Sequence, residues 1–92
     1  MADPIAEIKS LLDHGRLIIG TAETVKKLRG KHLDKVYLSA NCGADTREDI
    51  THLAALDNVP IIDLAMNSEE LGATCRKPFH IQTLGVAKAH DE

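Results

Sequence analysis

The chain has 92 residues, of which 43% are hydrophobic and 27% charged, and its formal net charge is −3 at pH 7. We predict one domain over residues 1–92, because a second core would be smaller than proteins usually stabilise. The composition excludes a disordered, collagen-like or low-complexity chain. Aromatic residues make up only 2%, namely Tyr37 and Phe79, which excludes a platform of several rings for stacking bases.

Cysteine use and the N-terminal sequence indicate a cytoplasmic protein. Cys42 and Cys75 are separated by 32 residues, which is neither a CxxC pair nor a secreted disulfide framework. No apolar stretch approaches the ~20 residues of a membrane span, and the N-terminus lacks a signal-peptide pattern. The five histidines form no pair at metal-ligand spacing. We therefore expect no metal, no cofactor and no membrane partner.

The first elements in chain order are a helix, a strand and a second helix. Asp3 caps a helix with Pro4 at its first position, and apolar residues recur at helical spacing until Gly15. Residues 16–20 form a short apolar strand that ends in glycine. A second helix follows, and its expected cap, inner residues and end are Thr21, Val25, Leu28 and Gly30.

The rest of the chain repeats this alternation. Residues 36–40 and 59–64 are apolar strands, and Pro60 indicates that the latter lies at an edge or begins there. Between them, Asp45 and Glu48 have the spacing of a capping box, for a helix that turns Ile50, Leu53 and Ala54 inward. A last helix runs from Asn67 or Ser68 to about Cys75 and precedes a strand over 79–87.

The order αβαβαβαβ predicts an α/β fold, a three-layer α/β/α sandwich around a four-stranded mixed sheet. Right-handed crossovers put helices on both faces, and we expect the sheet to be mainly parallel. Ligands of such sheets bind beyond the carboxyl ends of the strands, near helix N-termini. Residues 20–23 and 41–43 are expected there.

Charge is unevenly distributed along the chain. Residues 16–43 carry six basic and two acidic side chains, whereas residues 44–70 carry one basic and seven acidic ones. A net-acidic chain can therefore present a basic face to an anionic partner, although a solvated helix surface is the alternative interpretation.

The motifs do not indicate an enzyme. The turn at Gly20 exposes backbone N–H groups suited to phosphate, but it has neither GxGxxG nor a P-loop lysine. It equally fits an ordinary turn glycine. Cys42 beside Gly43 would need a nearby histidine to act as a nucleophile. We see no triad and no paired carboxylates, and we expect no small-molecule substrate.

Five segments taken in order carry a resemblance to a known family. They are residues 15–20 (GRLIIG), 24–29 (TVKKLR), 39–41 (SAN), 70–72 (ELG) and 77–79 (KPF). Together they resemble the L-seven-Ae kink-turn-binding superfamily, and within it the L-thirty-e family of the archaeal and eukaryotic large ribosomal subunit. The resemblance implies an α/β/α sandwich that docks on a sharply bent loop of ribosomal RNA, beside neighbouring ribosomal proteins in the cytoplasm, without catalysis.

The resemblance also implies an RNA surface, to which we add two cations suited to phosphates. The candidate RNA-binding residues are Gly20, Thr21, Glu23, Lys26, Lys27, Asn41, Arg76, Lys77 and Phe79. Each has an ordinary structural alternative. Asn41 can form a turn with Gly43, Phe79 can be a core residue at a strand start, and the lysines can be plain solvated cations. Glu23 can serve the helix dipole alone or accept hydrogen bonds from a guanine edge.

Two other functions remain open. The same fold serves as a kink-turn adaptor of small guide RNA or RNase P particles, but the guide-RNA branch usually has an acidic residue where Asn41 stands. An RNA-recognition domain of an RNA-modifying enzyme is the less favoured alternative, because 92 residues hold no cofactor motif.

Overall fold

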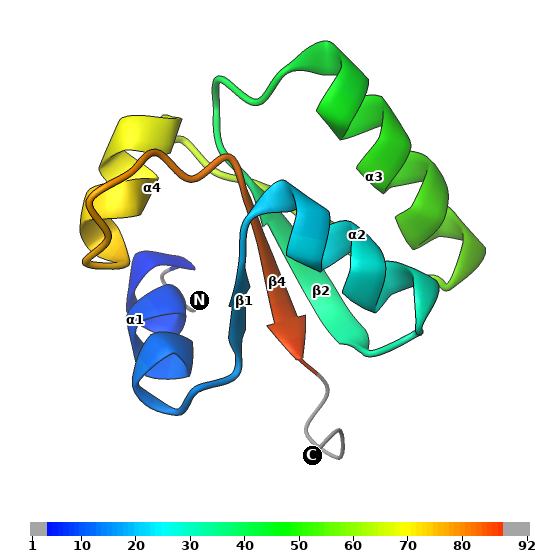
Figure 1. The fold of residues 1–92 in the computed structure, drawn as a ribbon, viewed down its shortest axis with the longest axis horizontal. Coiled ribbons are helices and arrows are strands. Elements are labelled where there is room, and N and C mark those ends of the chain that lie inside the picture. The colour runs from blue at the N-terminus through cyan, green and yellow to red at the C-terminus, as the bar shows by residue number, and fades with distance from the viewer. Residues whose placement is uncertain (1–3, 88–92) are drawn as a thin grey trace.

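The computed structural model describes residues 4–87 (Figure 1), so the expected cap Asp3 lies outside the described residues. Helices and strands alternate as the sequence predicts. In chain order they are α1 (Pro4–Asp13), β1 (Leu17–Ile19), α2 (Thr21–Arg29), β2 (Leu33–Leu38), α3 (Ala44–Leu56), β3 (Ile61–Asp63), α4 (Ser68–Thr74) and β4 (Thr83–Ala87).

The four strands form one mixed sheet in the order β1-β4-β2-β3. β4 runs antiparallel to both β1 and β2, and only β2 and β3 are parallel. The prediction of a mixed sheet is confirmed, but the prediction that it is mainly parallel is wrong. After the short helix α4 the chain turns back, and the Ile81 N–H donates to the Ser68 carbonyl at 3.0 Å. β4 therefore begins at the edge where β1, β2 and β3 end.

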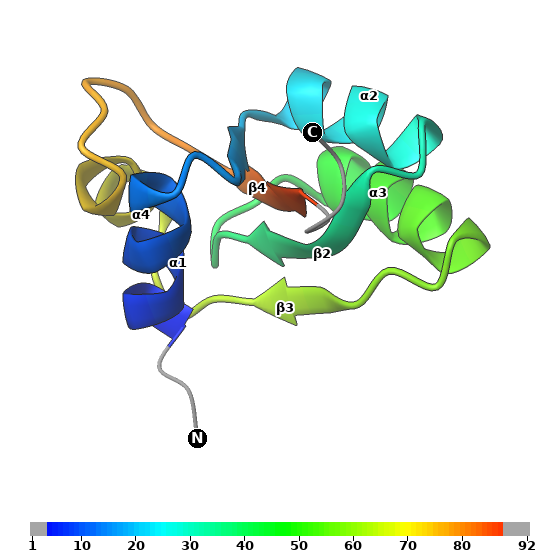
Figure 2. The ribbon, with the colours of Figure 1, turned by 90° about the horizontal axis from the view of Figure 1, so that it is seen from below.

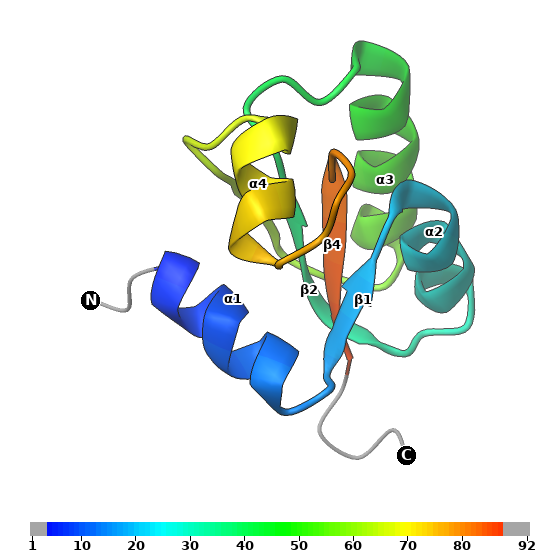
Figure 3. The same cartoon turned by 60° about the vertical axis from the view of Figure 1, so that its left-hand side comes forward.

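Two helices cover each face of the sheet, which confirms the three layers. Figure 1 shows α1 and α4 on the left of the sheet and α2 and α3 on the right, and Figures 2 and 3 agree. Each face has its own aliphatic core. The core under α1 and α4 includes Ile8, Tyr37, Leu71, Ile81 and Leu84. The core under α2 and α3 includes Leu28, Leu33, Val36, Leu38 and Ile50.

Helix starts differ from the sequence prediction in two places. The residues that precede α2 and α3 are Gly20 and Gly43, and neither helix has a side-chain cap. Thr21 is instead the first residue of α2, and its hydroxyl donates to Thr83 Oγ1 of β4 at 3.1 Å. The predicted capping box from Asp45 is absent, since α3 already begins at Ala44.

Other boundaries follow the local signals. α4 has the predicted cap at Asn67 together with a full capping box through Glu70, and α2 is followed by Gly30. Thr24 and Leu28 are buried on the inner side of α2, and the predicted inner residue Val25 is partly buried against the same core.

The strand boundaries differ more. β2 begins at Leu33, three residues earlier than predicted, and ends at Leu38. The third strand lies at the sheet edge, as Pro60 indicates. β4 begins only at Thr83, so the prediction that Phe79 stands at a strand start is wrong. It lies in the loop between α4 and β4.

Candidate nucleic-acid interface

Four connections meet at one edge of the sheet, which we call the loop edge: residues 20–21, 39–43, 64–67 and 76–82. Backbone hydrogen bonds fasten them together. The Gly20 N–H donates to the Thr83 carbonyl at 3.1 Å, the Ser39 N–H to Gln82 at 2.9 Å, and the Ala40 N–H to Met66 at 2.7 Å. The loop edge is therefore a connected surface rather than a set of independent loops.

The turn from β1 into α2 contributes the first part of this surface. Gly20 has φ +101° with open space where a Cβ would lie, so conformation rather than crowding favours glycine there. Glu23 and Lys26 are exposed on the first turns of α2, whereas Lys27 is partly buried. Within residues 4–87, Glu23 and Lys26 have no hydrogen bond or ion pair. Their charged groups are available to a ligand.

Asn41 contributes the second part, and its side chain is anchored. Its Oδ1 accepts from the Ser39 hydroxyl at 3.0 Å and from the Ser68 N–H at 2.7 Å. Its Nδ2 donates to Ser68 Oγ at 3.1 Å. The predicted alternative, a turn with Gly43, does not describe these contacts, because the amide bridges to the start of α4.

The loop between α4 and β4 contributes the third part. Phe79 is 53% exposed and lies outside both cores, which argues against the core interpretation. It lines a hollow of about 310 Å³ with five other residues, Glu69, Ala73, Lys77, Pro78 and His80. Arg76 and Lys77 are exposed beside it. An exposed ring next to cations suits stacking on an unpaired base.

Gly72 holds this loop against α4, a role that the sequence reasoning missed. A Cβ at Gly72 would lie 2.1 Å from the Phe79 carbonyl oxygen, so only glycine permits the approach. The Lys77 N–H donates to the Gly72 carbonyl at 2.9 Å. Glycine inside a helix costs about 0.5–1 kcal/mol of stability relative to alanine. A glycine within the predicted last helix is therefore a signal in the sequence that another segment approaches the helix closely at that point.

The shifted pKa values belong to Tyr37 and Cys75 in the core under α1 and α4 and to Glu7 of α1 at its margin. A hydrogen bond from Lys35 lowers the pKa of Glu7, while burial and then a hydrogen bond to Glu7 raise the pKa of Tyr37. Burial raises the pKa of the Cys75 thiol. These shifts follow from the packing of α1 and α4 on the sheet, and none of the three groups lies in the loop edge.

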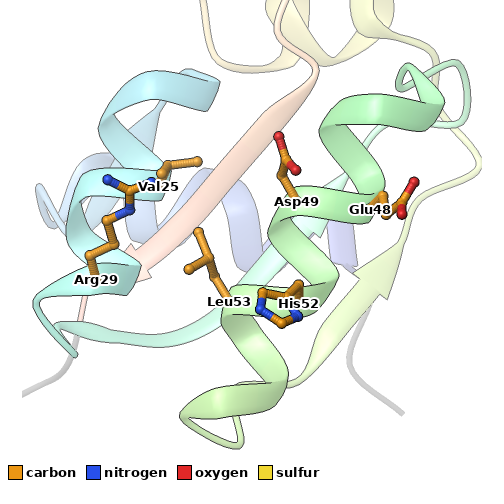
Figure 4. Close-up of a pocket in the computed structure, with 6 residues that line it drawn as sticks. All are labelled: Val25, Arg29, Glu48, Asp49, His52 and Leu53. Carbon is orange, nitrogen blue, oxygen red and sulfur yellow. The ribbon is translucent and has the colours of Figure 1, made fainter.

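A second hollow, which we call the groove, lies between α2 and α3 (Figure 4). Its volume is about 390 Å³, and its lining residues are Val25, Arg29, Glu48, Asp49, His52 and Leu53. None of its four charged or titratable side chains forms a hydrogen bond or ion pair with the part of the chain described here.

Residues 4–87 hold no cluster of three metal-ligating side chains, and none of their helices is long and apolar enough to cross a membrane.

Comparison with known proteins identifies the family. Residues 5–92 match the family described as Ribosomal protein L7Ae/L30e/S12e/Gadd45. The chain belongs to this family. Its relatives include the large ribosomal subunit protein eL30 of Saccharolobus solfataricus, 32% identical over 92% of this chain and 79% of that protein. The eL30 of Methanocaldococcus jannaschii is 35% identical over 86% of this chain and 72% of that protein.

Solved structures support the same fold. A protein of unknown function from Bacillus halodurans superposes with a TM-score of 0.85 over 97% of this chain and 88% of that one, at 20% identity. The 15.5kD RNA binding protein of Giardia lamblia gives a TM-score of 0.67 over 99% of this chain and 79% of that one, at 22% identity.

Proposed function

We propose that this chain is a structural constituent of the large ribosomal subunit and binds a kink-turn-like bend in ribosomal RNA through its loop edge. The observation that carries the proposal is the similarity to eL30 proteins over 86–92% of the chain. The loop edge supports it, because it brings an exposed ring, unpaired charges and backbone N–H groups to one surface. The protein acts without catalysis in the cytoplasm, as one domain over residues 1–92, beside neighbouring ribosomal proteins.

Each candidate residue has a proposed role in this contact, and that of the Asn41 amide is a hydrogen bond to a base edge or a ribose. Gly20 and Thr21 let the backbone approach the bend, and Phe79 stacks on an unpaired base. The Glu23 carboxylate accepts hydrogen bonds from a guanine edge. The cations bind phosphates, and these are Lys26, Lys27, Arg76 and Lys77.

A binding experiment with a modified base tests this assignment. Wild type and Glu23→Gln are titrated with a kink-turn RNA and with the same RNA in which inosine, lacking the amino group, replaces the sheared G·A guanines. Wild type should lose roughly 1–3 kcal/mol of affinity on this replacement, and Glu23→Gln should lose less. Equal losses in the two proteins would show that Glu23 does not contact the guanine edge. Its role would then be limited to the favourable interaction of its charge with the dipole at the N-terminus of α2.

Sedimentation separates the ribosomal function from its alternative. A large-subunit constituent should travel with the large subunit through a sucrose gradient. Sedimentation with a small guide RNA or RNase P particle instead would favour the adaptor function.

A further inference from the structure

The orientation of the Asn41 amide is fixed by the chemistry of its neighbours. A backbone N–H can only donate, so the amide atom 2.7 Å from the Ser68 nitrogen is the oxygen. The Ser39 hydroxyl donates to the same oxygen at 3.0 Å. An amide oxygen has two lone pairs, and both are therefore occupied from within the protein.

The amide nitrogen is only half used. Its two hydrogens can make two bonds, and one of them goes to Ser68 Oγ at 3.1 Å. Ser39 and Ser68 are 0% and 3% exposed, whereas Asn41 itself is exposed. The buried serines therefore engage three of the four hydrogen-bonding sites of the amide, which leaves one N–H donor and no free acceptor.

We infer that Asn41 contacts the RNA only as a hydrogen-bond donor and therefore selects an acceptor atom there. This inference rests on the proposed function and adds the polarity of one contact to it. The acceptor is a base ring nitrogen or carbonyl oxygen, a ribose oxygen or a phosphate oxygen. Ser68 is a positioning residue, because its hydroxyl accepts a hydrogen bond from the N–H that would otherwise be a second free donor of Asn41.

The same bridge links the amide to the exposed ring. The Ser68 carbonyl accepts from the Ile81 N–H at 3.0 Å, and Phe79 precedes Ile81 by two residues. Asn41 and the loop that carries Phe79 are thus fastened to the same residue at the start of α4. Such preorganisation reduces the entropy that binding must overcome.

Asn41→Asp tests the donor with little change of shape. Aspartate accepts hydrogen bonds but has no N–H. The matched control is Asn67→Asp, which adds the same charge at the α4 cap, where aspartate caps as well as asparagine. We expect Asn41→Asp to lose roughly tenfold in affinity for a kink-turn RNA, and the control to lose far less. Equal losses in the two variants would overturn the inference, because charge alone would explain them.

Modified RNAs then identify the partner atom. Each nucleotide of the bend receives, one at a time, a 7-deazapurine, a base without its carbonyl oxygen such as 2-aminopurine for guanine, a 2′-deoxyribose or a methylphosphonate, each of which removes or weakens one acceptor. One of these should weaken wild type but not Asn41→Ala, and its kind distinguishes base, ribose and phosphate. If inosine, which removes a donor, is instead the replacement that Asn41→Ala no longer senses, Asn41 is an acceptor and the inference is wrong.

Ser68 variants test its positioning role. In Ser68→Ala the second N–H of Asn41 loses its acceptor and becomes free to bind another atom of the RNA. The critical RNA replacement should therefore cost this variant less affinity than it costs wild type. Ser68→Thr, which keeps a hydroxyl, should restore the full loss. An unchanged loss in a folded Ser68→Ala would overturn the role. If wild type does not prefer bent over straight RNA, the proposed function and this inference fail together. A preference that stays undiminished in Asn41→Asp contradicts the inference alone.

Discussion

The loop edge and the groove between α2 and α3 differ in organisation rather than in size. The groove is the larger hollow, about 390 Å³ against about 310 Å³, and charged groups line it. Yet its charged side chains have no partner within residues 4–87, whereas three hydrogen bonds orient Asn41 and a glycine fixes the loop of Phe79. Oriented polar groups mark a binding surface better than volume does, because orientation lowers the entropic cost of binding.

Gly72→Ala should have the largest effect on the loop edge. The new methyl would meet the Phe79 backbone carbonyl, so α4 and the loop must move apart. Overpacking of this kind costs about 1–3 kcal/mol. We expect a lower free energy of unfolding in urea together with weaker RNA binding. Ala55→Gly on the exposed side of α3, away from the loop edge, is the control, since it costs up to ~1 kcal/mol in helix propensity and should leave RNA affinity intact.

Phe79→Ala should weaken RNA binding by roughly 1–3 kcal/mol, because a stacked base is lost. The melting temperature should change little, since the ring is 53% exposed. Leu56→Ala, at a position 72% exposed at the end of α3, serves as the matched control and should bind RNA normally. Early melting of Phe79→Ala with unchanged affinity at low temperature would assign the ring to the core instead.

Lys26→Ala should weaken binding to all bent RNAs about equally. If about four phosphates are contacted, the slope of log affinity against log salt is near −3 to −4, and the variant should make it shallower by about one. Lys9→Ala, which removes an exposed charge from α1, should leave the slope unchanged. A slope near zero in wild type would remove the basis for phosphate contacts at the loop edge.

Asp49→Asn in the groove should have the smallest effect. Exposed substitutions away from organised contacts usually change stability by less than about 0.5 kcal/mol, and we expect RNA affinity to stay within about twofold. Titration of the same RNA checks this. A loss comparable to that of Phe79→Ala would extend the interface to α3 and end the contrast between the two regions.

The sequence by itself determined the elements whose signals are local. Asn67 and Glu70 form their capping box within one turn, and Gly30 follows α2. Pro60 stands before an edge strand, because it has no N–H to donate. The alternation of helix and strand follows from apolar spacing in the same way, and it was enough to indicate three layers, whereas the family was indicated by the resemblance of five short segments.

Only the tertiary structure decided features that depend on distant partners. Thr21 is the predicted cap of the second helix, but its hydroxyl instead donates to Thr83, 62 positions away. The predicted sheet is mainly parallel, but β4 enters between β1 and β2 from the loop edge and runs antiparallel to both. The Asn41 amide is oriented by Ser68, 27 positions away. Such contacts leave no periodicity in the chain, because their partners are brought together only by folding.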